Sequence, residues 1–210
     1  MRFQPDKFNG FLNALAQQWV WRKAYACPCI SSRSGQAVPN CIHCNGNGRL
    51  WGDPVNGSAC VIGRSAVLKF SKFGEYLNED IFLEVPSDSP LYEMGVYDRV
   101  DSINRTEPFS QNIVAGINVA KKFDVLSVEK VFWLDTDNNR VEGDIPAVQN
   151  DGSLSWAGVI PPTGVTYSIT GRRNAQFYCY AQLPLDRPHF GGLDLPRRLV
   201  LRNYSLYESS

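Results

Sequence analysis

AQFYCYAQL, residues 175–183, is the clearest β-strand signal in the chain. Its apolar residues occupy alternate positions, at Phe177, Cys179, Ala181 and Leu183, and tyrosines fill two of the positions between them. Successive side chains of an extended strand point to opposite faces, so these four residues share one face. The alternation therefore predicts a half-buried strand whose apolar face packs against a core.

Five further segments have the same character, because they are short, rich in β-branched and aromatic residues, and separated by Gly, Pro, Asn and Asp. They are VIGRSAVLKF (61–70), DIFLEV (80–85), VEKVFWLD (128–135), GVTYSIT (164–170) and RRLVLRNYSL (197–206). DTDNN, residues 135–139, is typical of a hairpin tip. Strands at this spacing, without helical patterns between them, predict an antiparallel β-sandwich or small β-barrel over residues 61–210.

The N-terminal part, residues 1–26, has the pattern of an amphipathic helix instead. From residue 6 to residue 24 its apolar side chains recur at steps of three and four, which places them on one helical face. They are Phe8, Phe11, Leu12, Leu15 and Trp19, joined by the stem of Arg22. Pro5 and Asp6 suit the first turn, because Pro needs no N–H partner there and an acid complements the helix dipole. The predicted fold class is mainly β with one N-terminal α-helix.

Between these parts lie four clustered cysteines, Cys27 and Cys29 in CPC and Cys41 and Cys44 in CIHCNGNG. Zinc takes four thiolate or imidazole ligands in a tetrahedron, and two short cysteine turns joined by a loop bring such ligands together. The connecting loop is polar and contains Gly and Pro, so it can turn back without a helix or strand. The spacing predicts a zinc-binding knuckle over residues 27–60.

The second cysteine turn is the stronger half of this prediction. Gly46 and Gly48 are expected to adopt positive φ and to aim backbone N–H groups at the thiolates. CPC is tighter than the usual CxxC spacing. His43 is a candidate to replace Cys27 or Cys29 as a ligand, although a solvent-facing histidine is the commoner arrangement in such a turn.

Disulfides or free thiols are the alternative to zinc. No secretory signal is expected, because the first residues carry an acid and a lysine before the apolar stretch and lack a small-residue cleavage site. Synthesis in a reducing cytoplasm is then the default, and clustered cysteines there are more often metal ligands than cross-links. Cys60 and Cys179 are isolated and are expected to be small buried hydrophobes.

A site with four cysteine ligands has no open position for water, so it stabilises structure rather than catalyses. Residues 27–60 contain few large aliphatic side chains, and zinc would take the place of a core there. The two histidines, His43 and His189, lie outside any catalytic pattern, and no GxSxG, P-loop or GxGxxG motif occurs. No catalytic or cofactor-binding residue is therefore assigned, and apolar runs too short for a transmembrane helix predict no membrane association.

Charge is balanced overall, from 21 basic and 21 acidic side chains, but it is unevenly placed. Acids dominate residues 75–107 and arginines dominate residues 172–202. A chain with an acidic middle and a basic end can pair head to tail with copies of itself, because complementary fields steer association. A solvated surface with chance clustering is the alternative explanation.

Nucleic-acid binding is a second functional candidate. Zinc knuckles with neighbouring basic and aromatic residues bind single strands, and Arg33, Arg49 and Trp51 lie close to the cysteines. The formal net charge of zero, however, lacks the basic footprint expected of such proteins.

CIHCNGNG, residues 41–48, resembles one unit of the CxxCxGxG repeat of DnaJ-type chaperone zinc domains. Those domains carry four such units and this chain has one, so chaperone function is not implied. The wider arrangement consists of a helix ending in WVWRKAYACPC, one knuckle, a β region and the C-terminal segment LPRRLVLRNYSL. It resembles structural proteins of tailed-phage necks, the adaptors between head and tail.

The resemblance to neck proteins implies a non-enzymatic virion component, made in the host cytoplasm and located in the neck. It implies a homo-oligomeric ring between portal or adaptor proteins and tail proteins, with DNA passing through the lumen. Opposite charges on different parts of one chain suit cyclic, heterologous contacts, and net neutrality suits a conduit that does not hold DNA tightly. On this interpretation the zinc stabilises a contact surface in the assembly.

Overall fold

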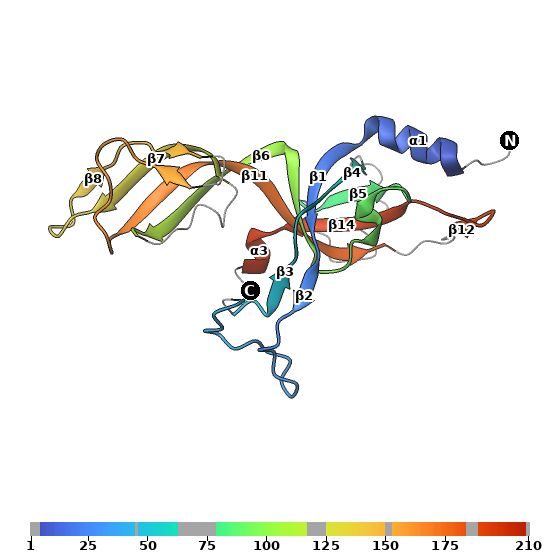
Figure 1. Cartoon of the computed structure of the whole chain (residues 1–210), viewed down its shortest axis with the longest axis horizontal. Helices are drawn as coiled ribbons and strands as arrows, with labels where there is room; N and C mark the ends of the chain where they lie inside the picture. The colour runs from blue at the N-terminus through green and yellow to red at the C-terminus, as the bar shows by residue number, and fades with distance from the viewer. Residues whose placement is uncertain are drawn as a thin grey trace. The chain divides into compact units, whose positions relative to one another are not determined.

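The fold is mostly β and divides into two compact units (Figure 1). The computed structural model describes residues 5–44, 46–62, 79–116, 125–149, 153–183 and 189–208. Unit 1 comprises Met1–Asn104 and Gln176–Ser210, and unit 2 comprises Arg105–Ala175. The chain passes between the units along two long strands, β6 (Arg99–Val114) and β11 (Thr166–Gln182).

Unit 1 is built on a closed β-barrel. Its strands are hydrogen-bonded in the order β14-β5-β4-β1-β6-β11, and a further pairing of β11 with β14 closes the ring. The four strands confined to this unit are β1 (Gln17–Arg22), β4 (Val55–Val61), β5 (Ile81–Val85) and β14 (Arg197–Asn203). Of the two predicted architectures, sandwich or barrel, the structure forms the barrel.

Every strand of the barrel contributes buried side chains to its interior packing. The indole of Trp19 is 1 % exposed and meets the ring of Phe177 edge-on, with 6.2 Å between centroids. Further buried apolar residues are Ala59, Leu83, Val85, Val100, Leu199 and Leu201. The strand predicted over residues 175–183 is confirmed, and Phe177 and Cys179 are buried, but the expected alternation is not, because Gln176 and Tyr178 between them are buried as well.

The N-terminal helix is shorter than the sequence pattern predicts. Helix α1 spans Pro5–Leu15, and the expected continuation to residue 24 is wrong because β1 begins at Gln17. Trp19 and Trp21 are spaced by two, which puts both indoles on the buried side of a strand. The apparent helical step from Leu15 to Trp19 is a coincidence of spacing between two different elements.

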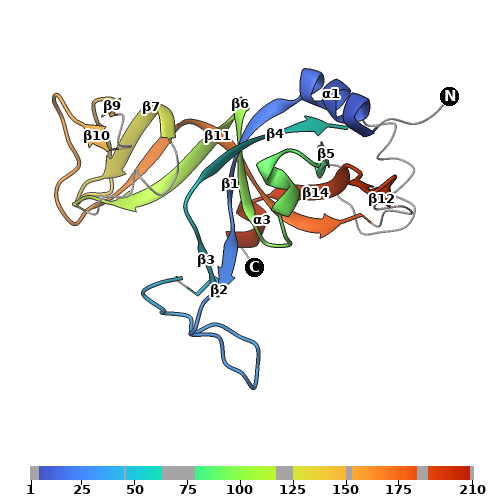
Figure 2. The same cartoon turned by 45° about the vertical axis from the view of Figure 1, so that its right-hand side comes forward.

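The strand β4 occupies the end of the segment predicted as the knuckle, residues 27–60. Inside it, the short strands β2 (Ala24–Ala26) and β3 (Arg49–Trp51) pair with each other. The β2–β3 pair thus continues the β1–β4 pair beyond the barrel. The two chain segments leave the barrel side by side (Figure 2). We call residues 24–52 the cysteine arm.

Unit 2 holds the rest of the eight-stranded sheet and has a core of its own. In it β6 and β11 continue beside β7 (Val125–Leu134) and β8 (Arg140–Glu142), in the order β6-β11-β7-β8, and β9 (Ala147–Val148) pairs with β10 (Leu154–Ser155). The core residues are Phe109, Ile113, Ala115, Val125, Val128, Val131, Trp133, Tyr167 and Ile169. The predicted hairpin tip joins β7 to β8: Asp135 accepts from the backbone N–H groups of Asp137 and Asn139, and Asn138 has a φ of 61°.

Three small elements complete unit 1. They are the 3-10 helix η1 (Pro90–Glu93), the ribbon of β12 (His189–Phe190) with β13 (Leu193–Asp194), and the C-terminal helix α3 (Ser205–Glu208). The strand predicted over residues 61–70 lies largely outside the described residues. Across the residues that are described, no helix is long and apolar enough to cross a membrane.

Arginines from the C-terminal part pair with acids from the middle of the chain within the same molecule. Two pairs lie in unit 1 and one in unit 2: Arg202 with Asp80 at 3.0 Å, Arg198 with Glu84 at 3.2 Å, and Arg173 with Glu107 at 2.9 Å. The guanidinium of Arg202 also lies 3.6 Å from the ring centroid of Tyr180. These paired charges are satisfied internally, so they no longer support the head-to-tail charge pairing between copies that their positions in the sequence predicted.

Candidate metal centre

The cysteine arm holds its loop closed by backbone pairing at the base. Ala26 lies opposite Arg49 in the β2–β3 ribbon, and the N–H of Cys27 donates to the carbonyl of Gly48 at 2.9 Å. The N–H of Ile30 then donates to the carbonyl of Cys27 at 3.1 Å, which turns the chain directly after the ribbon. The first and last residues of the loop are therefore fixed beside each other before any metal is considered.

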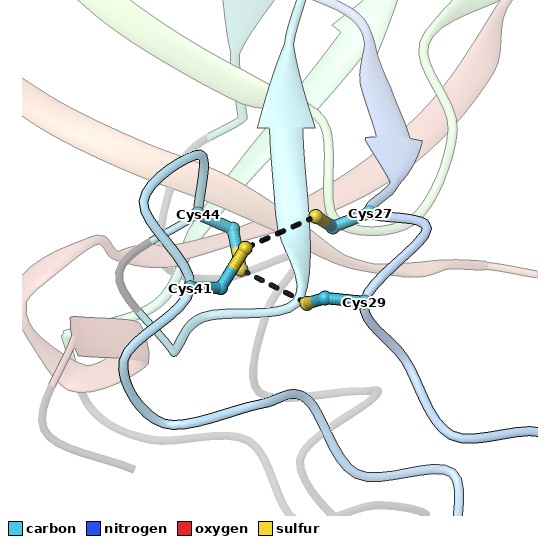
Figure 3. A group of neighbouring side chains, drawn as sticks. All are labelled: Cys27, Cys29, Cys41 and Cys44. Carbon is cyan, nitrogen blue, oxygen red and sulfur yellow. Dashed lines mark hydrogen bonds between the residues drawn. The ribbon is translucent and has the colours of Figure 1, made fainter.

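The structure brings Cys27, Cys29, Cys41 and Cys44 together, with all four sulfur atoms within 4.8 Å of one another. Cys27 Sγ lies 3.8 Å from Cys41 Sγ, and Cys29 Sγ lies 3.4 Å from Cys44 Sγ. Figure 3 shows the two CPC side chains reaching across the loop toward the two from the second turn. Sulfurs each about 2.3 Å from a tetrahedral zinc ion lie about 3.8 Å apart, so the cluster has the dimensions of one metal site.

The two glycines of the second turn adopt the conformation that the sequence predicts. Gly46 has a φ of 87° and Gly48 a φ of 69°, a region that other residues enter at a cost. The N–H of Gly48 donates to Cys44 Sγ at 3.3 Å. A Cβ on Gly46 would lie 2.9 Å from the carbonyl oxygen of Pro39, so a side chain has no room there.

The thiols are placed in unequal electrostatic surroundings. Backbone N–H groups of Cys44 and His43 lower the pKa of Cys41 to about 6, which favours its thiolate at neutral pH. A backbone hydrogen bond from Val38 acts in the same direction on Cys29, but burial and the three neighbouring thiols outweigh it and raise its pKa to about 12. Thiols packed this closely resist ionising together because their thiolates would repel one another. A bound cation would compensate that negative charge.

The other candidate ligands stand apart from the cluster. His43 lies between the two cysteines of the second turn and its side chain is exposed. Cys60 and Cys179 are buried, as predicted, and their thiols donate to the carbonyls of Leu12 and Ala181. Within the described part of the chain, the four arm cysteines are the one group of His, Cys, Asp or Glu side chains close enough to hold a metal ion.

An aromatic cluster that the sequence did not reveal supports the arm at its base. Arg49, Trp51, Tyr97, Tyr204 and Tyr207 form this aromatic anchor. The Trp51 indole is edge-on to the Tyr204 ring at 5.6 Å and donates its N–H to the carbonyl of Tyr97 at 3.3 Å. The guanidinium of Arg49 lies 4.4 Å from the Tyr97 ring centroid, and the rings of Tyr204 and Tyr207 stack at 5.9 Å.

The anchor also joins the C-terminal helix to the metal loop. The hydroxyl of Tyr207 in α3 donates to the carbonyl of Asn47 at 3.0 Å, and Asn47 lies between Cys44 and Gly48. Burial is the main cause of a raised pKa at Tyr207, which keeps the hydroxyl protonated as a donor. The last turn of the chain thus contacts the second cysteine turn directly.

Asp98 fixes the junction between barrel and arm. It is 3 % exposed, and its carboxylate accepts from the Trp21 indole at 2.8 Å and from the backbone N–H groups of Ala24 and Gly95 at 2.7 and 2.8 Å. Trp21 belongs to the barrel and Ala24 to the arm, so one carboxylate binds both. No local pattern around Asp98 indicates this role, because its partners are distant in sequence.

Two of the residues predicted for nucleic-acid binding serve the anchor instead. Arg49 lies over the Tyr97 ring and Trp51 packs edge-on against two tyrosines, and both side chains are partly buried. Arg33 is the exposed basic residue of the loop. Arg49 and Trp51 thus have a structural role in the anchor, and nucleic-acid binding stays a prediction.

Comparison with known proteins adds no family to this picture. No protein-family model matches the chain, and no curated protein matches it in sequence. The functional argument therefore rests on the arm and its anchor.

Proposed function

We propose that the chain is a non-enzymatic structural protein of a tailed-phage neck, and that its cysteine arm holds a structural zinc ion. In this role it forms a ring with copies of itself between portal or adaptor proteins and tail proteins, in the virion. DNA passes through the lumen of the ring.

The sulfur cluster is the observation that carries the metal part of the proposal. Four sulfur donors suit zinc, and with all four engaged no coordination position stays open for water or substrate. The loop between Cys27 and Cys44 has mostly exposed side chains and no apolar core of its own. A metal ion of this kind supplies folding energy that such a segment lacks, about 10–16 kcal/mol in zinc-finger peptides.

The proposed place in a phage neck is supported by where the two resembling segments lie. The cysteine segment and the segment LPRRLVLRNYSL carry the resemblance, and the latter forms β14 and the start of α3. Tyr204 at the end of that segment packs on Trp51 of the arm. Both segments therefore help to hold a rigid arm on a closed barrel. Such an arm suits a protein that works through fixed contacts.

Metal analysis and particle imaging on the purified chain test this proposal. We expect one zinc per chain, loss of metal in Cys41→Ser and Cys44→Ser, and retention in the matched control Cys60→Ser. We expect rings in negative stain and a corresponding mass by light scattering. Monomers at every concentration, together with absence from virions, would contradict the neck assignment, and a metal-free protein with an ordered arm would contradict the zinc assignment.

A further inference from the structure

The loop of the cysteine arm carries two exposed apolar side chains, Val38 and Ile42, which we call the knob, and one charged residue. Ile42 is 86 % exposed and directly follows Cys41, and Val38, three residues before Cys41, is 52 % exposed. Arg33 is the only Asp, Glu, Lys or Arg between residues 27 and 48, and its side chain is exposed. A loop held rigid by a metal loses little conformational entropy when such side chains are buried against a partner.

Helix α1 carries a second exposed apolar patch. Phe11 and Leu15 are one helical turn apart, so they form one stripe, and they are 58 % and 61 % exposed. Leu12 on the adjoining face is 4 % exposed against the barrel. The helix is thus docked through Leu12, and its Phe11–Leu15 stripe lies exposed on one flank of that contact.

A polar pocket adjoins this helix. It has a volume of about 300 Å³ and is lined by Asn13, Gln18, Asn56, Ser58, Asp88 and Ser89, with Gly57 and Pro90. Asp88 is its only charged lining residue; its side chain is exposed and accepts one hydrogen bond from the Asn13 amide at 3.0 Å. A carboxylate with oxygen positions to spare in a polar pocket suits a guanidinium, which donates through a planar fork.

We propose that the cysteine arm of one copy docks on the α1 face of the next copy. Val38 and Ile42 then cover Phe11 and Leu15, and Arg33 enters the pocket to pair with Asp88. The arm loop and α1 lie on opposite sides of the barrel in Figures 1 and 2, so the two surfaces cannot meet within one molecule. A contact between unlike surfaces is heterologous, and repeated by rotation it closes a ring.

This inference rests on the ring-forming part of the proposed function and gives that ring its interface. Both partners of the contact belong to unit 1. Apolar side chains supply the buried centre and the arginine supplies orientation, which is the usual division of roles in specific interfaces.

Two single variants separate the two halves of the contact. Ile42→Asp changes the knob and Phe11→Asp changes the stripe, and each is expected to weaken self-association at least roughly tenfold, as loss of a central interface residue does. The matched controls are Tyr25→Asp, on an exposed arm residue at the base, and Gly10→Asp, where a Cβ meets nothing within 4 Å. Both controls are expected to assemble like the original chain, and metal content and circular dichroism check that all four variants fold.

Mixing the two variants gives the sharper test. The Ile42→Asp variant keeps an intact Phe11–Leu15 stripe, and the Phe11→Asp variant keeps an intact knob. A one-to-one mixture is therefore expected to form a dimer through one intact contact and no larger assembly. Analytical ultracentrifugation distinguishes this dimer from rings and monomers. A mixture that stays monomeric, or single variants that still form rings, would overturn the docking mode.

A charge exchange keeps the test independent of the apolar variants. Arg33→Glu and Asp88→Arg should each weaken association, and the double variant should recover most of it, because the pair is restored with its charges exchanged. Rings that persist in every variant would reject this interface while leaving the neck proposal standing. A chain that is monomeric at every concentration before any substitution would reject this interface, and its absence from virions as well would reject the neck proposal.

Discussion

At Gly46 a single hydrogen side chain makes the second cysteine turn possible. We expect Gly46→Ala to weaken metal binding and to destabilise the arm, because φ is 87° there and the new Cβ would lie 2.9 Å from the carbonyl oxygen of Pro39. The left-handed conformation alone costs a residue with a Cβ about 1–2 kcal/mol. Competition with a chromophoric zinc chelator measures the change in affinity.

Gly35→Ala is the matched control for that substitution. Gly35 has a φ of 69° in the same loop, but a Cβ there meets nothing within 4 Å. Gly35→Ala should therefore carry the conformational cost without the steric one. Its loss of zinc affinity should be smaller than that of Gly46→Ala. Equal losses at the two positions would mean that the contact with Pro39 contributes nothing.

At Asp98 three N–H donors depend on one buried carboxylate. Asp98→Asn replaces an acceptor oxygen by an NH₂ group that cannot accept, so at least one donor is left unpaired. We expect a loss of about 2–4 kcal/mol in the free energy of unfolding, since buried donors without partners are costly. Urea unfolding measures it, and Asp53→Asn, at an exposed position, should change stability by less than about 0.5 kcal/mol.

These residues differ in how far the sequence predicts them. The four cysteines and two glycines lie in one short segment, where spacing and conformational preference carry the information. Asp98 and Tyr97 are polar or aromatic residues without a local pattern, and their roles come from partners brought in by other strands. Tyr97 even has a φ of 74°, a conformation that nothing in its neighbourhood of the sequence indicates.

At the scale of elements, richness in β-branched and aromatic residues predicts the apolar strands and misses the polar ones. β5, β7, β11 and β14 are apolar and were predicted, although β11 joins two predicted strands into one. β6 was missed because RTEPFSQN within it is polar and contains a proline, features that usually mark a loop. β1 was missed because Trp19, four residues after Leu15, continues the helical spacing of α1 by chance.

The short helix α3 is expected to act as a clamp on the metal loop. Tyr207→Ala removes the ring that meets Trp51, Tyr97 and Tyr204 as well as the hydrogen bond to Asn47. We therefore expect faster release of zinc and faster proteolysis within the arm. Stopped-flow transfer of zinc to a chelator measures the first effect, and limited proteolysis the second.

Tyr207→Phe separates the two contributions of that residue. The phenyl ring keeps the aromatic packing and loses only the hydroxyl, so the expected cost is about 1 kcal/mol. Release of zinc from Tyr207→Phe should be close to that of the original chain. If Tyr207→Ala behaves like Tyr207→Phe, the helix does not clamp the loop.

At the scale of the whole molecule, Arg173, Arg198 and Arg202 find their acidic partners within the same chain, which linear charge clustering did not predict. Residues 80–84 and 198–202 are far apart in sequence, but β5 and β14 are neighbours in the barrel, and their acids and arginines face one another. The sequence shows the two clusters and cannot show that the fold joins them. The exposure of Phe11 and Leu15 in α1 and of Val38 and Ile42 in the arm could not be predicted for the same reason, since exposure depends on the finished fold.

The barrel and the arm should respond differently to loss of metal. The barrel closes through strand pairing and a buried apolar interior, whereas the loop between Cys27 and Cys44 lacks a core. Chelation at neutral pH is therefore expected to expose the arm to proteases and to hydrogen exchange while far-UV circular dichroism changes little. Protection of the arm that survives chelation would contradict a structural metal, and loss of the barrel signal would show that the barrel depends on it.

Unit 2 is inserted into unit 1 between two neighbouring strands, which makes its removal a test of the whole architecture. Asn104 and Gln176 end the unit 1 parts of β6 and β11, and these strands pair in the barrel. Joining the two residues by a short glycine-containing turn leaves all six barrel strands, the arm and the anchor in place.

The shortened chain is expected to fold cooperatively and to bind zinc with the affinity of the full chain. The reason is that unit 2 buries its own core, from Phe109 to Ile169, while the parts of β6 and β11 that belong to the barrel lie in unit 1. Thermal unfolding and zinc titration measure the two properties, with Cys44→Ser in the same background as the control for specific binding. A shortened chain that keeps its secondary structure but loses zinc would show that the arm needs unit 2, and one that does not fold would show that the barrel does.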